Sequence, residues 1–241
     1  MRCRFDTDIG LRREENQDAV RCEYFGHNIL AVVCDGMGGE RAGKEASMIA
    51  IEEFFQRFNQ GYSESLSDDD IRKLLISSVS AANSVIYTKA RLDFKNFGMG
   101  TTCVAAFVTD KTAFIANVGD SRAYLITSKG IHQITSDHNV AAMLFEQGKI
   151  TEEEMQTHPQ KHMLVRAVGV EKTVLTDTFL LDYEDSISLL LCSDGLSGYC
   201  TDDEIYSVIK DKELDDIPKE LIDLALEKGG RDNVTVAVIS E

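Results

Sequence analysis

Apolar residues follow two different spacings in the first third of the chain, and these spacings predict one strand and two helices. The run 28–34 is short, nearly all apolar and β-branched, and it stops at Asp35-Gly36, so we expect a strand buried on both faces. Residues 43–58 repeat apolar side chains at helical spacing. Residues 71–86 do the same, and Ser67 with Asp70 resembles a capping box at the start of that helix.

After residue 101 the pattern changes to short β-rich runs. Strands are expected at 102–108, 112–118, 122–126 and 131–134, with only a few turn residues between them. Connections this short join antiparallel strands. Further strands are predicted at 173–181, 186–192 and 234–239, and further helices after Thr201 and over 217–226. The fold class is therefore α+β, with antiparallel sheets covered by helices rather than a parallel doubly wound sheet.

Residues 139–165 interrupt this β-rich pattern. A helix is predicted over 140–147, Thr151 with Glu154 offers a capping box for another, and His158-Pro159 ends the pattern. We interpret 139–165 as an insertion at the edge of the core. The chain has only two prolines and no Ser/Gly-rich linker, so residues 1–241 are expected to form a single domain.

The charge balance limits the partners that the protein is expected to have. The 241 residues include 25 Lys+Arg and 41 Asp+Glu, for a formal net charge of −16. Such a chain is repelled by phosphate backbones and by anionic membrane surfaces, so nucleic acid and membrane are not expected as partners. No apolar run reaches the roughly 18 residues of a transmembrane helix, and no signal core follows Met1. We therefore expect a cytoplasmic protein.

The six cysteines are scattered and show neither a CxxC pair nor metal-ligand spacing with histidine. Several, including Cys34 and Cys192, lie inside apolar runs, where a thiol packs as a small hydrophobe. All six are expected to be reduced.

Four aspartates fall at the ends of predicted strands, and they suggest chemistry. They are Asp35, Asp120, Asp194 and Asp232, and the first three each have an adjacent glycine. Carboxylates brought together repel one another, so a cluster of this kind needs hard divalent cations such as Mg²⁺ or Mn²⁺. The alternative for each Asp-Gly pair alone is an ordinary turn.

An N-terminal segment with the spacing Asp-x-Gly-x-x-Arg-x-x-Asn-Gln-Asp ends at Asp18, and a family pattern continues from it. In order, the blocks are Asp35-Gly36-Met37-Gly38-Gly39, Gly39 to Ser47, Gly98-Met99-Gly100-Thr101-Thr102, Asn117 to Arg122, Thr135-Ser136-Asp137-His138, Arg166 to Gly169, Cys192 to Leu196 and Gly229 to Thr235. Together they resemble the metal-dependent serine/threonine protein phosphatases of the type 2C class, and most closely the compact bacterial members. The resemblance covers nearly the whole chain.

The resemblance implies a four-layer α-β-β-α sandwich of two antiparallel sheets flanked by helices, with 139–165 as the flap beside the active site. It implies two core Mn²⁺ or Mg²⁺ ions, and a weaker third one. By this resemblance Asp35 would bridge the core ions, the Gly36 carbonyl would bind one of them, and Asp194 and Asp232 would complete the shell of the other ion. Asp18 acts through water, and Asp120 with Asp194 matches the third site.

The same resemblance implies the reaction. Arg13 grips the substrate phosphate, for which a planar bidentate donor is suited. A hydroxide that bridges two divalent ions attacks phosphorus in line, without a phosphoenzyme intermediate. Phosphorylated proteins are the implied partners, among them a Ser/Thr kinase and its substrates, and the family usually acts as a monomer.

The chain departs from the broader family at one position. Many eukaryotic members carry a histidine two residues after the bridging aspartate, proposed as the general acid, whereas Met37 stands there and cannot donate a proton. His138 is interpreted as structural rather than catalytic.

Three other functional classes fit the sequence less well. Residues 38–45 nearly fit a phosphate-binding loop, but Glu45 stands where that loop needs a Ser or Thr hydroxyl. A catalytically weak regulatory relative is expected to lack metal ligands, which this chain has. A partner-switching phosphatase acting on one phosphorylated regulator shares the chemistry, and the missing sensor domain weighs against it.

Overall fold

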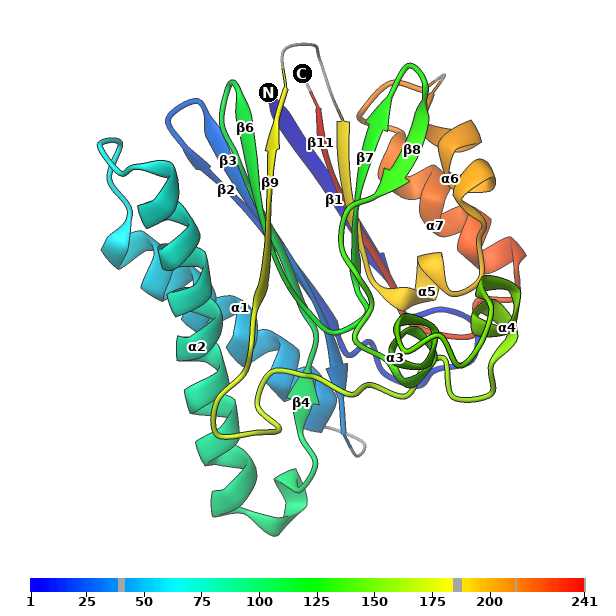
Figure 1. The fold of residues 1–241 in the computed structure, drawn as a ribbon, viewed down its shortest axis with the longest axis horizontal. Helices are drawn as coiled ribbons and strands as arrows, with labels where there is room; N and C mark the ends of the chain where they lie inside the picture. Colours follow the sequence, from blue (N-terminus) through cyan, green and yellow to red (C-terminus); the bar gives the residue numbers. More distant parts are fainter. Residues whose placement is uncertain (39–41, 184–187, 211, 241) are drawn as a thin grey trace.

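The computed structural model describes residues 1–38, 42–183, 188–210 and 212–240, and two antiparallel sheets form its centre (Figure 1). One sheet has the order β1 (Arg2–Asp8), β11 (Val234–Ser240), β10 (Ser188–Cys192), β7 (Arg122–Thr127), β8 (Gly130–Gln133). The other has the order β2 (Asp18–Phe25), β3 (Asn28–Met37), β5 (Cys103–Val108), β6 (Thr112–Val118), β9 (Asp177–Asp182), with β4 (Gly100–Thr101) pairing the end of β3.

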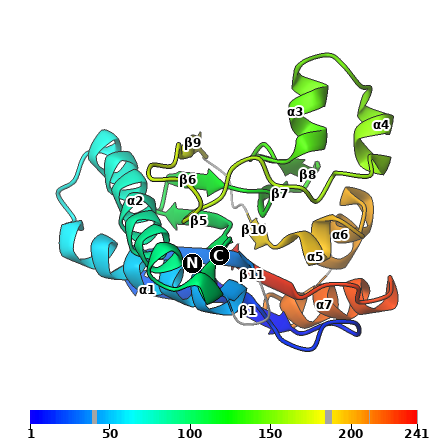
Figure 2. The same cartoon turned by 90° about the horizontal axis from the view of Figure 1, so that it is seen from below.

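Helices cover the outer faces of both sheets. The β3 sheet carries α1 (Ala42–Gly61) and α2 (Asp68–Leu92), and the 3-10 turn η1 (Phe94–Asn96) follows α2. The β10 sheet carries α5 (Asp194–Ser197), α6 (Asp202–Ile209) and α7 (Ile217–Glu227). Figures 1 and 2 show the resulting α-β-β-α layers. The predicted fold class and layer order are therefore confirmed.

The strand over 28–34 is buried on both faces, as its apolar pattern predicts. Ile29, Ala31 and Val33 point into the layer between the sheets. Leu30 and Val32 alternate with them and pack under α1 and α2. Because successive side chains of a strand point to opposite faces, a run buried on both sides must be apolar throughout.

The flap contains the two predicted helices, α3 (Val140–Glu146) and α4 (Glu152–Thr157), and both lie at the edge of the core (Figure 2). The capping box at Thr151 and Glu154 is present. So are the one at Thr201 and Glu204 and the Ser67 cap of α2. Of the run 173–181, only the part from Asp177 onwards is strand, and residues 186 and 187 lie outside the described residues.

The expectation of six reduced thiols is wrong for one pair. Cys34, Cys103, Cys192 and Cys200 are free and buried, whereas Cys3 and Cys22 are joined by a disulfide. The reason is tertiary: β1 and β2 belong to opposite sheets, and both cysteines point into the layer between them, with their Cα atoms 6.9 Å apart. In the described part of the chain no helix is both long and apolar enough to cross a membrane.

Candidate active site

Strand ends from both sheets bring the predicted aspartates to one edge of the sandwich. Asp18 and Asp35 are register partners on β2 and β3, and Asp194 begins α5 two residues after the end of β10. Asp232 precedes β11, the neighbour of β10. The Ser193 hydroxyl donates to Asp18 Oδ2 at 2.7 Å and so ties the two sheets together at this point.

The carboxylates are close enough to perturb one another. Burial raises the pKa of Asp35 well above its usual range, and repulsion from Asp18 and then from Asp194 adds to the shift. The pKa of Asp18 is raised to about 7, mainly by burial, although hydrogen bonds from Thr235 and Ser193 oppose that rise. Burial and repulsion by Asp194 likewise raise the pKa of Asp120. Clustered, desolvated carboxylates of this kind are typical of functional sites.

The donor set fits a hard divalent cation. Carboxylate oxygen is the ligand type that Mg²⁺ and Mn²⁺ prefer. Asp18 Oδ1 is buried and has no hydrogen-bond partner among the described residues, so it lacks the compensation that a buried polar atom normally has. A bound cation, or water on it, would supply that compensation.

The predicted backbone ligand lies where only glycine fits. A Cβ on Gly36 would approach the Gly43 carbonyl oxygen to 2.0 Å and that of Gln17 to 2.7 Å. The Gly36 amide donates to the Gln17 carbonyl at 3.1 Å. The end of β3 is thereby held against the start of α1. Of the block from Gly39 to Ser47, residues 39–41 lie outside the described residues.

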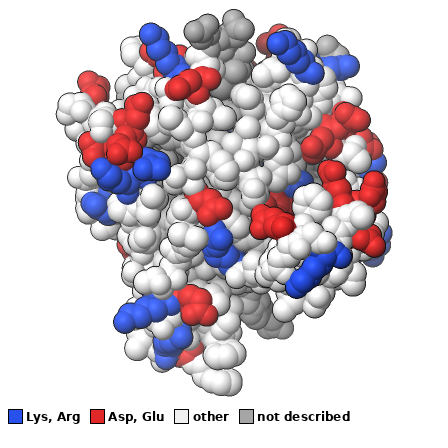
Figure 3. All heavy atoms as spheres, in the orientation of Figure 1, with Lys and Arg blue, Asp and Glu red and all other residues white. Residues whose placement is uncertain are grey.

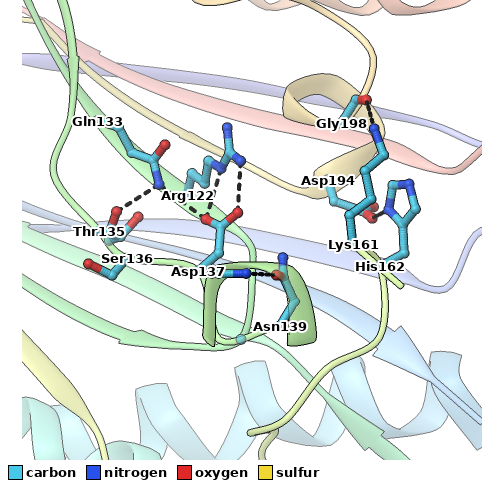
Figure 4. A network of polar contacts seen from close by, with 12 residues as sticks. Arg122, Gln133, Thr135, Ser136, Asp137, Asn139, Lys161, His162, Asp194 and Gly198 are labelled. Carbon is cyan, nitrogen blue, oxygen red and sulfur yellow. Dashed lines mark hydrogen bonds and ion pairs between the residues drawn. The ribbon is translucent and has the colours of Figure 1, made fainter. Parts of the chain in front are cut away.

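Two of the aspartates are paired with cationic or imidazole groups. Arg13 Nη2 donates to Asp232 Oδ2 at 2.6 Å, which places the predicted phosphate-binding residue beside a predicted metal ligand. His162 of the flap lies 2.9 Å from Asp194 through Nδ1 (Figure 4). Within the described ranges, no group of three His, Cys, Asp or Glu side chains is arranged to hold a metal ion.

His162 is a site residue that sequence reasoning missed. It is separated from Asp194 by 32 residues, and no local spacing connects them. Its neighbour Lys161 donates to the Gly198 carbonyl at 3.3 Å, so two successive flap residues bind α5 and the residue that follows it (Figure 4). The sequence signal for both residues was their place in the insertion 139–165 rather than in the core.

Asp120 is held by a glycine turn and by His138. Gly119 has φ +106°, and a Cβ there would approach Thr102 Cγ2 to 2.5 Å, so glycine is required. The Gly119 amide donates to His138 Nδ1 at 3.0 Å, and His138 Nε2 lies 3.1 Å from Asp177 Oδ2. His138 is buried and supports the turn, which agrees with its structural interpretation.

A cleft of about 550 Å³ opens beside these residues. Asp120, Asp194 and His162 line it, together with residues of α4 and of the α5–α6 connection. Arg122 also lines it and forms a bidentate pair with Asp137, with Nη2–Oδ2 at 2.7 Å and Nε–Oδ1 at 2.9 Å (Figure 4). Two of the clustered carboxylates, those of Asp120 and Asp194, are thus reached from the flap side.

The chain is similar to known proteins over nearly its whole length. Residues 12–228 match the family model of protein phosphatase 2C. The chain is 36% identical over 243 residues to the serine/threonine phosphatase stp of Listeria monocytogenes, covering 99% of this chain and 95% of that protein. The structure of the phosphatase Stp1 from Staphylococcus aureus superposes with a TM-score of 0.92 at 38% identity, covering 99% and 94% of the chains.

A further solved structure, the catalytic domain of the phosphatase PstP in complex with two manganese ions, has a TM-score of 0.84 at 32% identity and covers 98% of this chain and 96% of that one. These similarities extend over the whole sandwich, including the edge where the aspartates converge. The chain therefore belongs to the protein phosphatase 2C family and is a protein serine/threonine phosphatase.

Proposed function

We propose that Asp35, the Gly36 carbonyl, Asp194 and Asp232 hold two Mn²⁺ or Mg²⁺ ions, with Asp18 acting through water. The observation that carries this proposal is the convergence of strand-end carboxylates at one edge of the sandwich, where burial and repulsion between carboxylates raise the pKa values of Asp18 and Asp35. Divalent cations relieve that repulsion. Asp120 with Asp194 would form a weaker third site.

The ions would supply an activated water and neutralise charge on the phosphoryl oxygens. The chain's own residues position the substrate. Arg13 is half exposed at the edge of the site and already directs its guanidinium at Asp232, so a phosphate dianion next to Asp232 lies within its reach. The planar fork of donors suits bidentate phosphate contact.

The proposed substrates are phosphoserine and phosphothreonine in proteins, with a Ser/Thr kinase and its substrates as partners. We further propose that residues 1–241 act as one catalytic domain, as a monomer, in the cytoplasm. The chain's acidity supports protein rather than nucleic-acid partners.

Removal of divalent ions is expected to abolish activity. Protein treated with a chelator and dialysed should not hydrolyse a phosphothreonine peptide or an aryl phosphate, and Mn²⁺ or Mg²⁺ should restore both reactions. Circular dichroism before and after treatment checks that the fold is retained. Full turnover by rigorously metal-free protein would refute the two-ion proposal.

Arg13→Ala is expected to raise KM for phosphopeptides about tenfold, because the guanidinium contacts the phosphate in the ground state as well as in the transition state. Steady-state kinetics on a phosphothreonine peptide measure this change. Arg12→Ala is the matched control, since Arg12 is the exposed neighbour of Arg13. Unchanged KM and kcat in Arg13→Ala would show that the ion pair with Asp232 has no part in substrate binding.

A further inference from the structure

Three large apolar side chains are exposed where α2 ends. Leu92, Phe94 and Phe97 are 81%, 90% and 78% exposed, and the two phenylalanine rings stack with their centroids 6.1 Å apart. We call this surface, together with Arg91 and Lys95, the aromatic tip. Single exposed apolar residues need no explanation, but a group of this kind is typical of an interaction site.

The aromatic tip is also cationic, in a chain whose net charge is −16. Arg91 stacks over the Tyr87 ring at 3.7 Å. In the part of the chain that the structure describes, neither Arg91 nor Lys95 pairs with a carboxylate. The carboxylate of Asp93 accepts from the Lys95 amide and caps η1. In Figure 3, Lys and Arg spheres lie at the lower end of the molecule, where α2 and η1 end, among white spheres and beside a few Asp and Glu spheres.

The aromatic tip lies close to the end of β3, the strand that carries Asp35. Gly100 pairs with Met37 and Thr101 with Gly36, and Gly100 is three residues after Phe97. Three residues span at most about 11 Å and paired strands lie about 5 Å apart, so the Phe97 Cα is no more than about 16 Å from that of Met37. Figure 1 shows β4 and the tip at the end of the sandwich that carries the end of β3.

We propose that the aromatic tip is a docking surface for an acidic segment with an apolar side chain in the phosphoprotein substrate. This inference rests on the proposed function, since it takes the substrate's phosphate to lie at Asp35. An extended segment covers about 3.3 Å per residue, so the docked residues lie about five to eight positions from the phosphorylated one.

The charges of the aromatic tip and of the rest of the chain favour an acidic peptide segment over an anionic membrane or a second copy of the chain. An anionic membrane would meet the same cations, but the rest of the chain is acidic and would be repelled from it. A second copy would place two acidic molecules against each other. An acidic peptide segment is small enough to meet the cations of the tip without meeting the remaining acidic surface.

The test compares phosphothreonine peptides of two lengths. A peptide of about twenty residues with glutamate and phenylalanine flanks reaches the tip, whereas one of about seven residues does not. In Phe94→Ser/Phe97→Ser, kcat/KM for the long peptide should fall roughly tenfold and that for the short peptide should stay unchanged. In Lys95→Glu, kcat/KM for the long acidic peptide should fall, and kcat/KM for a long peptide with lysine flanks should rise. Leu180→Ser, at another half-exposed apolar residue, is the control.

Several results would overturn the docking surface. Equal losses on the short peptide and an aryl phosphate would mean that the substitutions disturb β4 and the end of β3. An unchanged preference for the long peptide would exclude docking at the tip. If the wild type cosediments with phosphatidylglycerol vesicles and the double variant does not, the tip binds a membrane. If light scattering shows a dimer that is lost in the double variant, the tip binds a second copy of the chain. If wild type hydrolyses no phosphopeptide, the proposed function fails instead.

Discussion

Asp35→Asn is expected to lower kcat by about 10³-fold or more, because it removes charge from the centre of the carboxylate cluster that we propose holds both ions. Asparagine keeps the size and one oxygen of the side chain, so the packing at the end of β3 is retained. The measurement is kcat on an aryl phosphate at saturating Mn²⁺. Asp110→Asn, at an exposed turn between β5 and β6, is the control for loss of one acidic charge.

The same substitution is expected to stabilise the metal-free protein. Burial and repulsion by Asp18 and Asp194 hold the pKa of Asp35 well above its usual range, so the ionised carboxylate destabilises the folded state. Removing it should raise Tm without metal by about 2–4 °C for each kcal/mol recovered. An inactive variant with a lower Tm would be a folding defect, and near-normal turnover would exclude Asp35 from the reaction.

The sign of the pH dependence follows from the same cluster. The pKa of Asp18 is raised to about 7 in the folded protein, whereas an unfolded chain ionises aspartate near pH 4. The folded state therefore holds a proton that the unfolded state has released, and the stability of metal-free protein falls as the pH rises from about 4 to 7. Thermal melts in chelator across this range should show the fall, and Mn²⁺ should reverse it.

Local patterns predicted the parts of the fold that local physics determines. The strand over 28–34 follows from its two-sided apolar run, and the starts of α4 and α6 follow from the capping boxes at Thr151 and Thr201. In contrast, β1 was not predicted, because its side chains are mostly exposed or partly so. It is a strand because β11, more than 200 residues away, pairs with it.

In the candidate site, too, the local features were predicted from the sequence and the contacts between distant residues were not. Each aspartate could be placed at a strand end, and the order of the motif blocks identified the family. The pairing of Arg13 with Asp232 and of His162 with Asp194 joins residues 219 and 32 positions apart, and only the closed sandwich brings them together. The Cys3–Cys22 disulfide has the same origin, since it needs the two sheets to face each other.

The leaving oxygen of the substrate needs a proton, and Asp120 is the residue that we expect to help supply it. An aliphatic serine or threonine oxygen leaves poorly unless it is protonated, whereas an aryl oxide leaves with far less help. Met37 cannot supply a proton. Asp120 is buried, lines the cleft and is perturbed by Asp194. We therefore propose that Asp120 helps to hold the water that donates this proton, and that a divalent ion bound near Asp120 would lower the pKa of that water toward neutrality.

Asp120→Ala should consequently damage hydrolysis of phosphothreonine peptides about a hundredfold and that of an aryl phosphate much less. The measurement is the ratio of kcat/KM for the two substrates in wild type and variant, with binding of the two core Mn²⁺ ions followed by calorimetry. Because the turn at Gly119 is held by His138 through the backbone, truncation of the Asp120 side chain leaves that support intact. Equal losses on both substrates would show that Asp120 serves only to bind metal, and a water or side chain elsewhere in the cleft would then have to protonate the leaving oxygen.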